Sequence, residues 1–269
     1  MDCNNNYCVE RHLLFLATFL ASFFAHATGT ALEQPVGYVE AGANYHHLTS
    51  GFDNWHGIYT KGVWQGYSEQ VWNWEVLRQS EFNDQGTYFT GGLSHTFDED
   101  WFATASAGAS SGGFFFPKHR FDLAINRRLL PDRNLVTTLG IGYLTARDIH
   151  RDRIILLGVA YYFDTPWVVE GGVRMNHSTP GSINANNYFI AVTQGRDKKR
   201  FLTLHIESGR EAYQLIDASS TLVNFHSDLI SLTWREWLKH GWGLNATIEH
   251  YSNPFYNRNG VIVGVFREF

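Results

Sequence analysis

From residue 36 onward, the sequence divides into segments of about ten residues in which apolar and polar side chains alternate. Successive side chains of a β-strand point to opposite faces, so each segment would have one apolar and one polar face. No segment after residue 27 approaches the roughly 18 consecutive apolar residues that a membrane-spanning helix needs. A chain that crosses a membrane without such a helix must close its strands into a barrel. The pattern therefore predicts an all-β fold, a transmembrane up-and-down antiparallel β-barrel.

The spacing of the segments predicts fourteen strands, with twelve or sixteen as alternatives because boundaries read from a sequence drift by about two to four residues. The predicted strands are 36–47, 57–67, 71–82, 87–97, 101–111, 118–129, 135–147, 153–163, 167–178, 187–196, 201–213, 227–238, 242–252 and 260–269. An even number places both chain ends on the periplasmic side. Longer loops are expected at the opposite end, at 49–55, 112–117, 179–186, 216–225 and 254–259.

The N-terminal residues have the pattern of a secretory signal. Arg11 precedes a short apolar run, 13–24, which leads to Ala25-His26-Ala27, a small-x-small cleavage pattern. We therefore expect residues 1–27 to be a signal peptide and residues 28–269 to be one outer-membrane barrel. Both cysteines, Cys3 and Cys8, would leave with the signal, so disulfides and cysteine-ligated zinc are not expected in the mature chain.

Composition narrows the classes of function. The net charge is −5, so the chain lacks the basic excess that nucleic-acid binding requires. The thirteen histidines show no spacing typical of metal ligands, and no cofactor or metal is predicted. Aromatic residues make up 16% of the chain and concentrate near strand ends, which is typical of the girdle at a membrane interface. The expected girdle residues are Trp101, Tyr143, Tyr161, Tyr162, Phe163, Trp167, Trp237, Trp242 and Tyr251.

Several segments are similar to those of a known family. They are 128–143 (RLLPDRNLVTTLGIGY), 161–174 (YYFDTPWVVEGGVR), 209–215 (GREAYQL) and the closing strand 261–269. In these segments the chain resembles the YaiO-type family of outer-membrane β-barrel proteins. The resemblance implies a location in the bacterial outer membrane and an accessory role in surface-polysaccharide systems. A departure is Arg267, which stands where an apolar residue is usual near the end of such barrels.

The polar faces of the strands carry both charge signs and are expected to line the lumen. The predicted lumen residues are Glu170, Arg174, His205, Glu207, Arg235, Glu249, Arg120 and Asp122, with Asn126 and Arg128 beside them. One interpretation is a lumen closed by ion pairs, because buried charges must be paired. The other is a narrow polar path that binds or passes hydroxylated molecules such as saccharides. Both make the protein a non-enzymatic structural, binding or transport component of the cell envelope.

An enzymatic alternative comes from His250-Tyr251-Ser252-Asn253, which resembles the H-x-S-N arrangement of outer-membrane lipid A deacylases. There a histidine activates a serine that attacks an ester. Parity places His250 and Ser252 on the lipid face, and pairing about the 239–241 turn would set Asp228 opposite Ser252. The following strand offers no outward acid, which counts against this alternative. The non-catalytic interpretation of these residues is a polar strand end at the outer rim.

The expected partners follow from the barrel. The outer face would contact outer-membrane lipids and lipopolysaccharide, and a saccharide would be the lumen ligand. We expect the barrel-assembly machinery to recognise the C-terminal aromatic residue Phe269. Nucleic acid is not expected as a partner.

Overall fold

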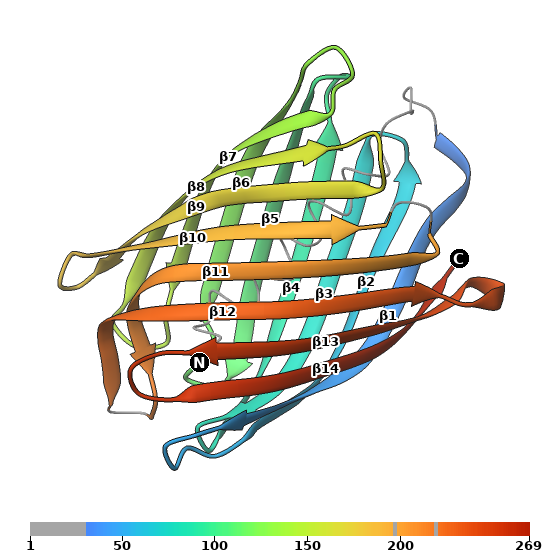
Figure 1. The fold of residues 1–269 in the computed structure, drawn as a ribbon. Coiled ribbons are helices and arrows are strands. Elements are labelled where there is room, and N and C mark those ends of the chain that lie inside the picture. Colours follow the sequence, from blue (N-terminus) through green and yellow to red (C-terminus); the bar gives the residue numbers. More distant parts are fainter. Residues whose placement is uncertain (1–30, 196–197, 218–219) are drawn as a thin grey trace.

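A computed structural model describes residues 31–195, 198–217 and 220–269, with side chains described from residue 34. The predicted signal peptide, Cys3 and Cys8 lie outside the described residues. Fourteen antiparallel strands close into one barrel, in which each strand pairs with its sequence neighbours and β1 pairs with β14. Figure 1 shows the tilted strands surrounding a single lumen, with β14 lying beside β1. The predicted strand number and fold class are confirmed.

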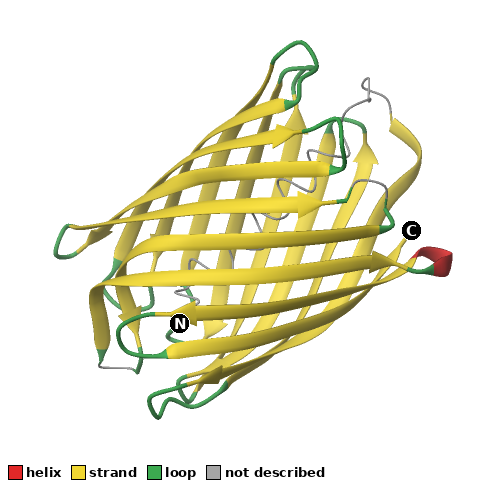
Figure 2. Cartoon of the chain, in the orientation of Figure 1, coloured by secondary structure: helices red, strands yellow, loops and turns green. Residues whose placement is uncertain are grey.

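The strands are joined by short connections, and strand makes up nearly all of the described chain (Figure 2). Their bounds are β1 (Ala31–Leu48), β2 (Trp55–Tyr67), β3 (Gln70–Glu81), β4 (Asp84–Thr96), β5 (Trp101–Gly112), β6 (His119–Leu129), β7 (Leu135–Thr145), β8 (Arg151–Tyr162), β9 (Trp167–Thr179), β10 (Ile183–Gln194), β11 (Arg200–Leu215), β12 (Thr221–Trp237), β13 (Trp242–Ser252) and β14 (Asn257–Glu268). A short 3-10 turn, Lys239–Gly241, joins β12 to β13. We call the end of the barrel where β1 ends the loop end, and the opposite end the turn end.

Two connections at the loop end are much shorter than the sequence predicted. β10 begins at Ile183 and β12 at Thr221, so residues 183–186 of the expected loop 179–186 and 221–225 of the expected loop 216–225 are strand. The ladder between β11 and β12 runs on to the pair Leu215 and Thr221. The reason is that backbone hydrogen bonds extend a hairpin beyond the part whose side chains alternate for a membrane. Alternation therefore marked the membrane part of each strand and missed its extension.

The outer face of the barrel is apolar along its middle. Large exposed side chains occur on strands around the barrel, for example Leu123, Ile141, Ile155, Ile190 and Val263. Such side chains are exposed to lipid in a membrane barrel, so the same pattern that would be a liability in water supports the spanning fold. Among the described residues, no helix is long and apolar enough to cross a membrane.

Aromatic side chains lie at both rims of the outer face. Trp101, Tyr143, Phe163, Trp167 and Trp242 are exposed, as the girdle interpretation predicted. Not every predicted member does so: Tyr162 lines the lumen cavity described below. Tyr251 points into the lumen and is 2% exposed, so its assignment to the girdle was wrong. Tyr251 follows the inward Glu249 by two residues on β13, so both side chains point to the same face.

Candidate functional site in the barrel lumen

The two halves of the lumen wall carry different side chains. The wall formed by β4 to β9 is rich in small inward residues, among them Ser106, Ala124, Gly140, Gly158 and Ala160. A cavity lies along this wall, because small side chains leave space that large ones would fill. Its polar and aromatic lining residues are Asn73, Ser94, Phe102, Thr104, Ser106, Arg120, Asp122, Asn126, Thr138, Tyr162, Glu170, Arg174 and Phe189. Four of the predicted lumen residues, Arg120, Asp122, Glu170 and Arg174, therefore line one cavity.

Arg120 and Asp122 form an ion pair on β6. The Arg120 Nε donates to Asp122 Oδ2 at 2.7 Å, and a second guanidinium nitrogen donates to Oδ1 at 2.9 Å. Two parallel bonds of this kind fix both the position and the orientation of the guanidinium. Asn126 lies on the same inward face of β6, beyond Asp122. It donates to the Phe102 carbonyl and accepts from Thr138. These fixed polar groups give the cavity a permanent set of hydrogen-bonding partners.

Two other predicted residues, His205 and Glu207, meet Arg174 where β9, β10 and β11 adjoin. The Glu207 carboxylate accepts from His205 Nε2 at 2.7 Å and lies 3.5 Å from the Arg174 guanidinium. The Arg174 guanidinium also lies over the Phe189 ring, 5.0 Å from its centroid. The sequence thus predicted which strands bear these charges, and the barrel brings them into one contact. Glu207 is 3% exposed, so pairing offsets the cost of burying its charge.

Arg235 pairs with a residue that the sequence interpretation missed. Its guanidinium donates to Glu40 Oε2 at 2.8 Å, and Glu40 also lies 3.3 Å from Lys61 Nζ. The Glu40 Oε1 accepts from Tyr59 at 2.8 Å and from Asn245 at 3.0 Å. Glu40 is 0% exposed. Parity within the predicted strand 36–47 would have found it, since Glu40 shares a face with inward Tyr38.

Glu249 also pairs with residues outside the predicted set. Its Oε1 lies 3.1 Å from an Arg258 guanidinium nitrogen and 3.1 Å from His46 Nε2. Arg258 lies over the rings of Trp55 and Tyr251, 4.9 Å from each centroid. The sequence interpretation missed Arg258 because it began the last strand at residue 260, whereas β14 begins at Asn257. The charges on this wall are therefore held in ion pairs among large side chains.

Aromatic side chains close over this wall at the loop end. We call the buried group Leu48, Trp55, Phe82, Leu229, Tyr251 and Tyr256 the aromatic cap. The rings of Trp55 and Phe82 meet edge to face at 5.0 Å, and Phe52 meets Tyr256 at 5.2 Å. Such geometries are favourable beyond the burial of apolar area. The connections carrying Phe52, Phe82 and Tyr256 thus fold inward over the lumen.

The hydroxyl of Tyr256 is held within the aromatic cap. It accepts a hydrogen bond from Gln214 Nε2 at 2.6 Å. Burial raises the pKa of this hydroxyl well above its usual value, so the group is neutral. The cap therefore adds no charge to the mouth of the lumen.

The connection between β5 and β6 also folds into the lumen. Phe115 and Phe116, each 2% exposed, pack with Tyr59, Leu77 and Tyr88. The rings of Tyr88 and Phe116 stack at 5.5 Å. The phenylalanine run 114–116 had no strand parity to interpret, and the sequence interpretation treated it as part of an outward loop. An apolar run of this kind instead buries itself in the available space.

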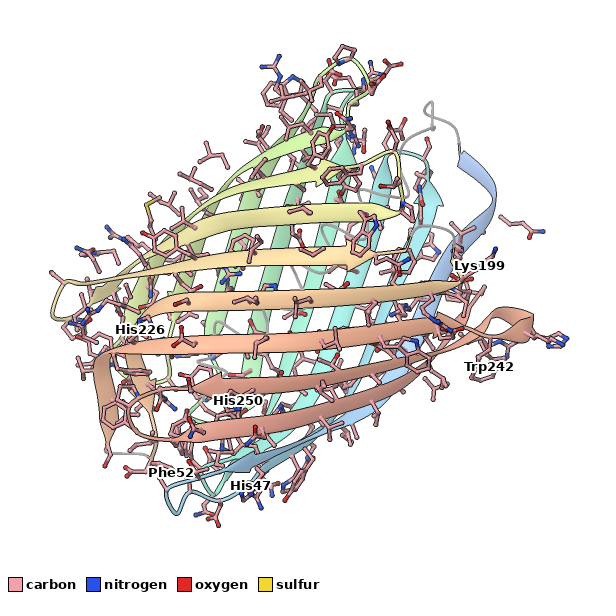
Figure 3. The ribbon with its side chains drawn as sticks, in the orientation of Figure 1. His47, Phe52, Lys199, His226, Trp242 and His250 are labelled. Atoms are coloured by element: carbon pink, nitrogen blue, oxygen red, sulfur yellow. The ribbon has the colours of Figure 1, made fainter. Side chains whose placement is uncertain are left out.

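The residues of the enzymatic alternative lie on the outer face at the loop end. Figure 3 shows His226 and His250 at this end with His47, opposite the end that carries Lys199 and Trp242. As predicted, Asp228 is the cross-strand partner of Ser252. The Asp228 carboxylate, however, lies 3.2 Å from His226 Nε2, and His250 Nδ1 lies 2.8 Å from Asn259 Oδ1. The structure therefore places Asp228 and Ser252 together, with separate partners for Asp228 and His250.

In the ranges that the structure describes, no group of three or more His, Cys, Asp or Glu side chains is placed to hold a metal ion. The paired carboxylates of the lumen face cations or amides instead.

Comparison with solved proteins places the fold. The chain resembles the TodX deltaS2S3 mutant monoaromatic hydrocarbon channel with a TM-score of 0.60 and 10% identity, over 93% of this chain and 92% of that chain. For the CymD monoaromatic hydrocarbon channel the TM-score is 0.57 and the identity 6%, over 88% of each chain. For a bacterial polysaccharide outer membrane secretin they are 0.51 and 9%, over 87% of this chain and 98% of that chain.

At these identities the likeness shows the fold alone. No curated protein matches the chain. The family model of the YaiO membrane beta barrel domain matches residues 36–214, well over half of the chain. The protein therefore belongs to the YaiO family, and it is a β-barrel of the bacterial outer membrane.

Proposed function

We propose that this protein is a non-enzymatic envelope component that binds or passes saccharide-like molecules along the β4–β9 wall of its lumen. The observation that carries the proposal is the cavity on that wall. Its lining combines fixed charges of both signs, amides and hydroxyls with the rings of Phe102, Tyr162 and Phe189. Sugars present many hydroxyl groups beside apolar ring faces, so this mixture suits them better than it suits a purely apolar or purely charged ligand.

The opposite wall supports the same proposal. Its charged side chains pair with one another beneath the aromatic cap, so they stabilise the barrel and keep that side filled. A wide barrel needs such filling if its passage is to be narrow. The link to surface polysaccharide comes from the family resemblance, and the likeness to a polysaccharide secretin is one of fold.

The test uses the purified full chain in planar bilayers. We expect a stable conductance that falls when a neutral linear oligosaccharide such as maltohexaose is added. The matched variant Asp122→Asn with Arg120→Gln removes the fixed pair from the cavity and should weaken this block. A barrel that neither conducts nor binds the oligosaccharide in equilibrium dialysis would overturn the proposal.

The alternative is a lipid A ester hydrolase that uses Ser252 and His250. The register that sets Asp228 opposite Ser252 favours it, because a carboxylate beside a serine and a histidine is the arrangement that such chemistry needs. The separate partners of Asp228 and His250 count against it. Fatty-acid release from lipopolysaccharide by the wild-type protein is the deciding measurement.

A further inference from the structure

Three neighbouring rows of outward side chains cross β6 to β9 near the loop end. The first row is apolar: Leu123, Ile141, Ile155 and Met175. The next row toward the loop end is mixed: Phe121, Tyr143, Arg153 and His177. The last row is polar: His119, Thr145, Arg151 and Thr179. The outer face thus changes from apolar to aromatic to cationic over four residues of each strand.

Arg151 and Arg153 differ from the other arginines of the described chain. Arg147 donates to Ser110, Arg210 to Asn224 and Arg200 to Glu236. The remaining described arginines contact a carboxylate, a carbonyl, an amide or an aromatic ring. Within the described ranges, no residue pairs with the guanidinium of Arg151 or of Arg153, and both residues are exposed.

The acid between these two arginines cannot neutralise them. Asp152 points to the opposite face of β8, where it accepts from Asn176 at 3.0 Å and from Ser178. Successive residues of a strand face opposite sides, so the sequence Arg151-Asp152-Arg153 places both cations outside and the acid inside. Two unneutralised cations at the edge of an apolar surface favour an anionic amphiphile.

We infer that this surface binds the lipid A part of lipopolysaccharide. Lipid A carries several acyl chains and phosphate groups on a sugar backbone. Its acyl chains would lie on the Leu123 row, its sugar on Phe121 and Tyr143, and a phosphate against Arg151 and Arg153. The turns beside the start of β1 face the periplasm in barrels of this kind, so the loop end lies in the outer leaflet. The inference is independent of the lumen function, since every residue of this surface faces outward.

The test uses purified, delipidated full-length protein and hexa-acylated bisphosphorylated lipid A, with binding measured by native mass spectrometry. Replacing both cations in Arg151→Gln/Arg153→Gln should weaken binding roughly tenfold or more, because guanidinium–phosphate hydrogen bonds are charge-assisted. The matched control Arg210→Gln removes an exposed arginine that already has a protein partner and should bind as the wild type does. Heat-modifiable gel mobility and lumen conductance should stay unchanged in both variants.

Two further probes identify the ligand. Removing the phosphates from lipid A should weaken its binding to the wild type at least as much as the double substitution weakens the binding of bisphosphorylated lipid A. Phosphatidylglycerol should not displace bisphosphorylated lipid A at equal concentration. Equal binding of lipid A by the wild type and the double variant would overturn the inference, and so would displacement by phosphatidylglycerol, which would make the surface one for anionic lipids in general.

Discussion

Glu40 on β1 and Arg235 on β12 form an ion pair of 2.8 Å across the inner face of β13 and β14. The pair bridges the place where the barrel closes, since β1 and β14 are the first and last strands. Side chains can cross β14 there because Gly264 leaves its inner face open beside Glu40. Charge pairing inside the lumen therefore adds to the backbone ladder where the barrel closes.

Removing the Glu40 carboxylate should destabilise the barrel. In Glu40→Ala, Arg235 and Lys61 lose their shared carboxylate in a buried site, which we expect to cost about 3–5 kcal/mol. Urea unfolding in lipid vesicles measures the free energy of unfolding. The control Glu236→Ala removes a carboxylate that pairs with Arg200 at the surface, and its effect should be small because solvent screens the pair. Equal shifts for the two variants would contradict the closure role.

The glycines on the inner face of β14 should be sensitive to added volume. A Cβ at Gly260 would lie 2.1 Å from His46 Cδ2 and 2.7 Å from Glu249 Cγ. Gly260→Ala should therefore lower the free energy of unfolding by about 1–3 kcal/mol through overpacking. Gly91→Ala is the matched control, because the nearest atom to its Cβ would be 4.0 Å away. A control that is as unstable as Gly260→Ala would refute the packing argument.

The phenylalanines that fold into the lumen should restrict passage. Phe115→Ala/Phe116→Ala removes two buried rings from beside Tyr88 and should raise single-channel conductance. Each substitution also loses apolar burial, so a lower free energy of unfolding, by about 3 kcal/mol or more, is expected. Ile149→Ala, at a loop residue that is 72% exposed, should change neither quantity. Conductance equal to that of the control would show that the rings do not limit the path.

Filling the cavity from its small-residue wall should block the proposed path. Gly158 lines the cavity, and a Cβ there would lie 3.5 Å from Thr138 Cβ, an ordinary contact. Gly158→Trp should therefore fold while lowering both conductance and oligosaccharide block. Val159→Trp places the same ring on the lipid face of β8 and should leave both quantities unchanged. If the two variants behave alike, the passage lies elsewhere in the lumen.

The enzymatic alternative makes the opposite prediction for the outer face. A non-enzymatic barrel predicts the same lipid A mass spectrum for cells carrying the wild type, Ser252→Ala or His250→Ala. His250 already lies 2.8 Å from Asn259, an amide that cannot act as an acid. Loss of a fatty acid from lipid A that depends on both Ser252 and His250 would establish the hydrolase in its place.

The inward charges could be assigned to a face from the sequence, but their partners could not. Alternation placed Arg174, Glu207 and Arg235 on inner faces, and the barrel confirms these faces. It could not pair Arg235 with Glu40, because these residues are 195 positions apart and meet only when the barrel closes. Arg258 and the run 114–116 escaped detection because they lie outside the segments in which alternation was visible.

The sequence by itself determined the strand number, the barrel class and the face of most side chains, because alternation is a local property of the extended chain. Only the tertiary structure decided which charges pair, where the aromatic cap lies and which wall keeps a cavity. These features depend on contacts between strands far apart in the sequence, and their positions are set by the register and by the curvature of the closed sheet.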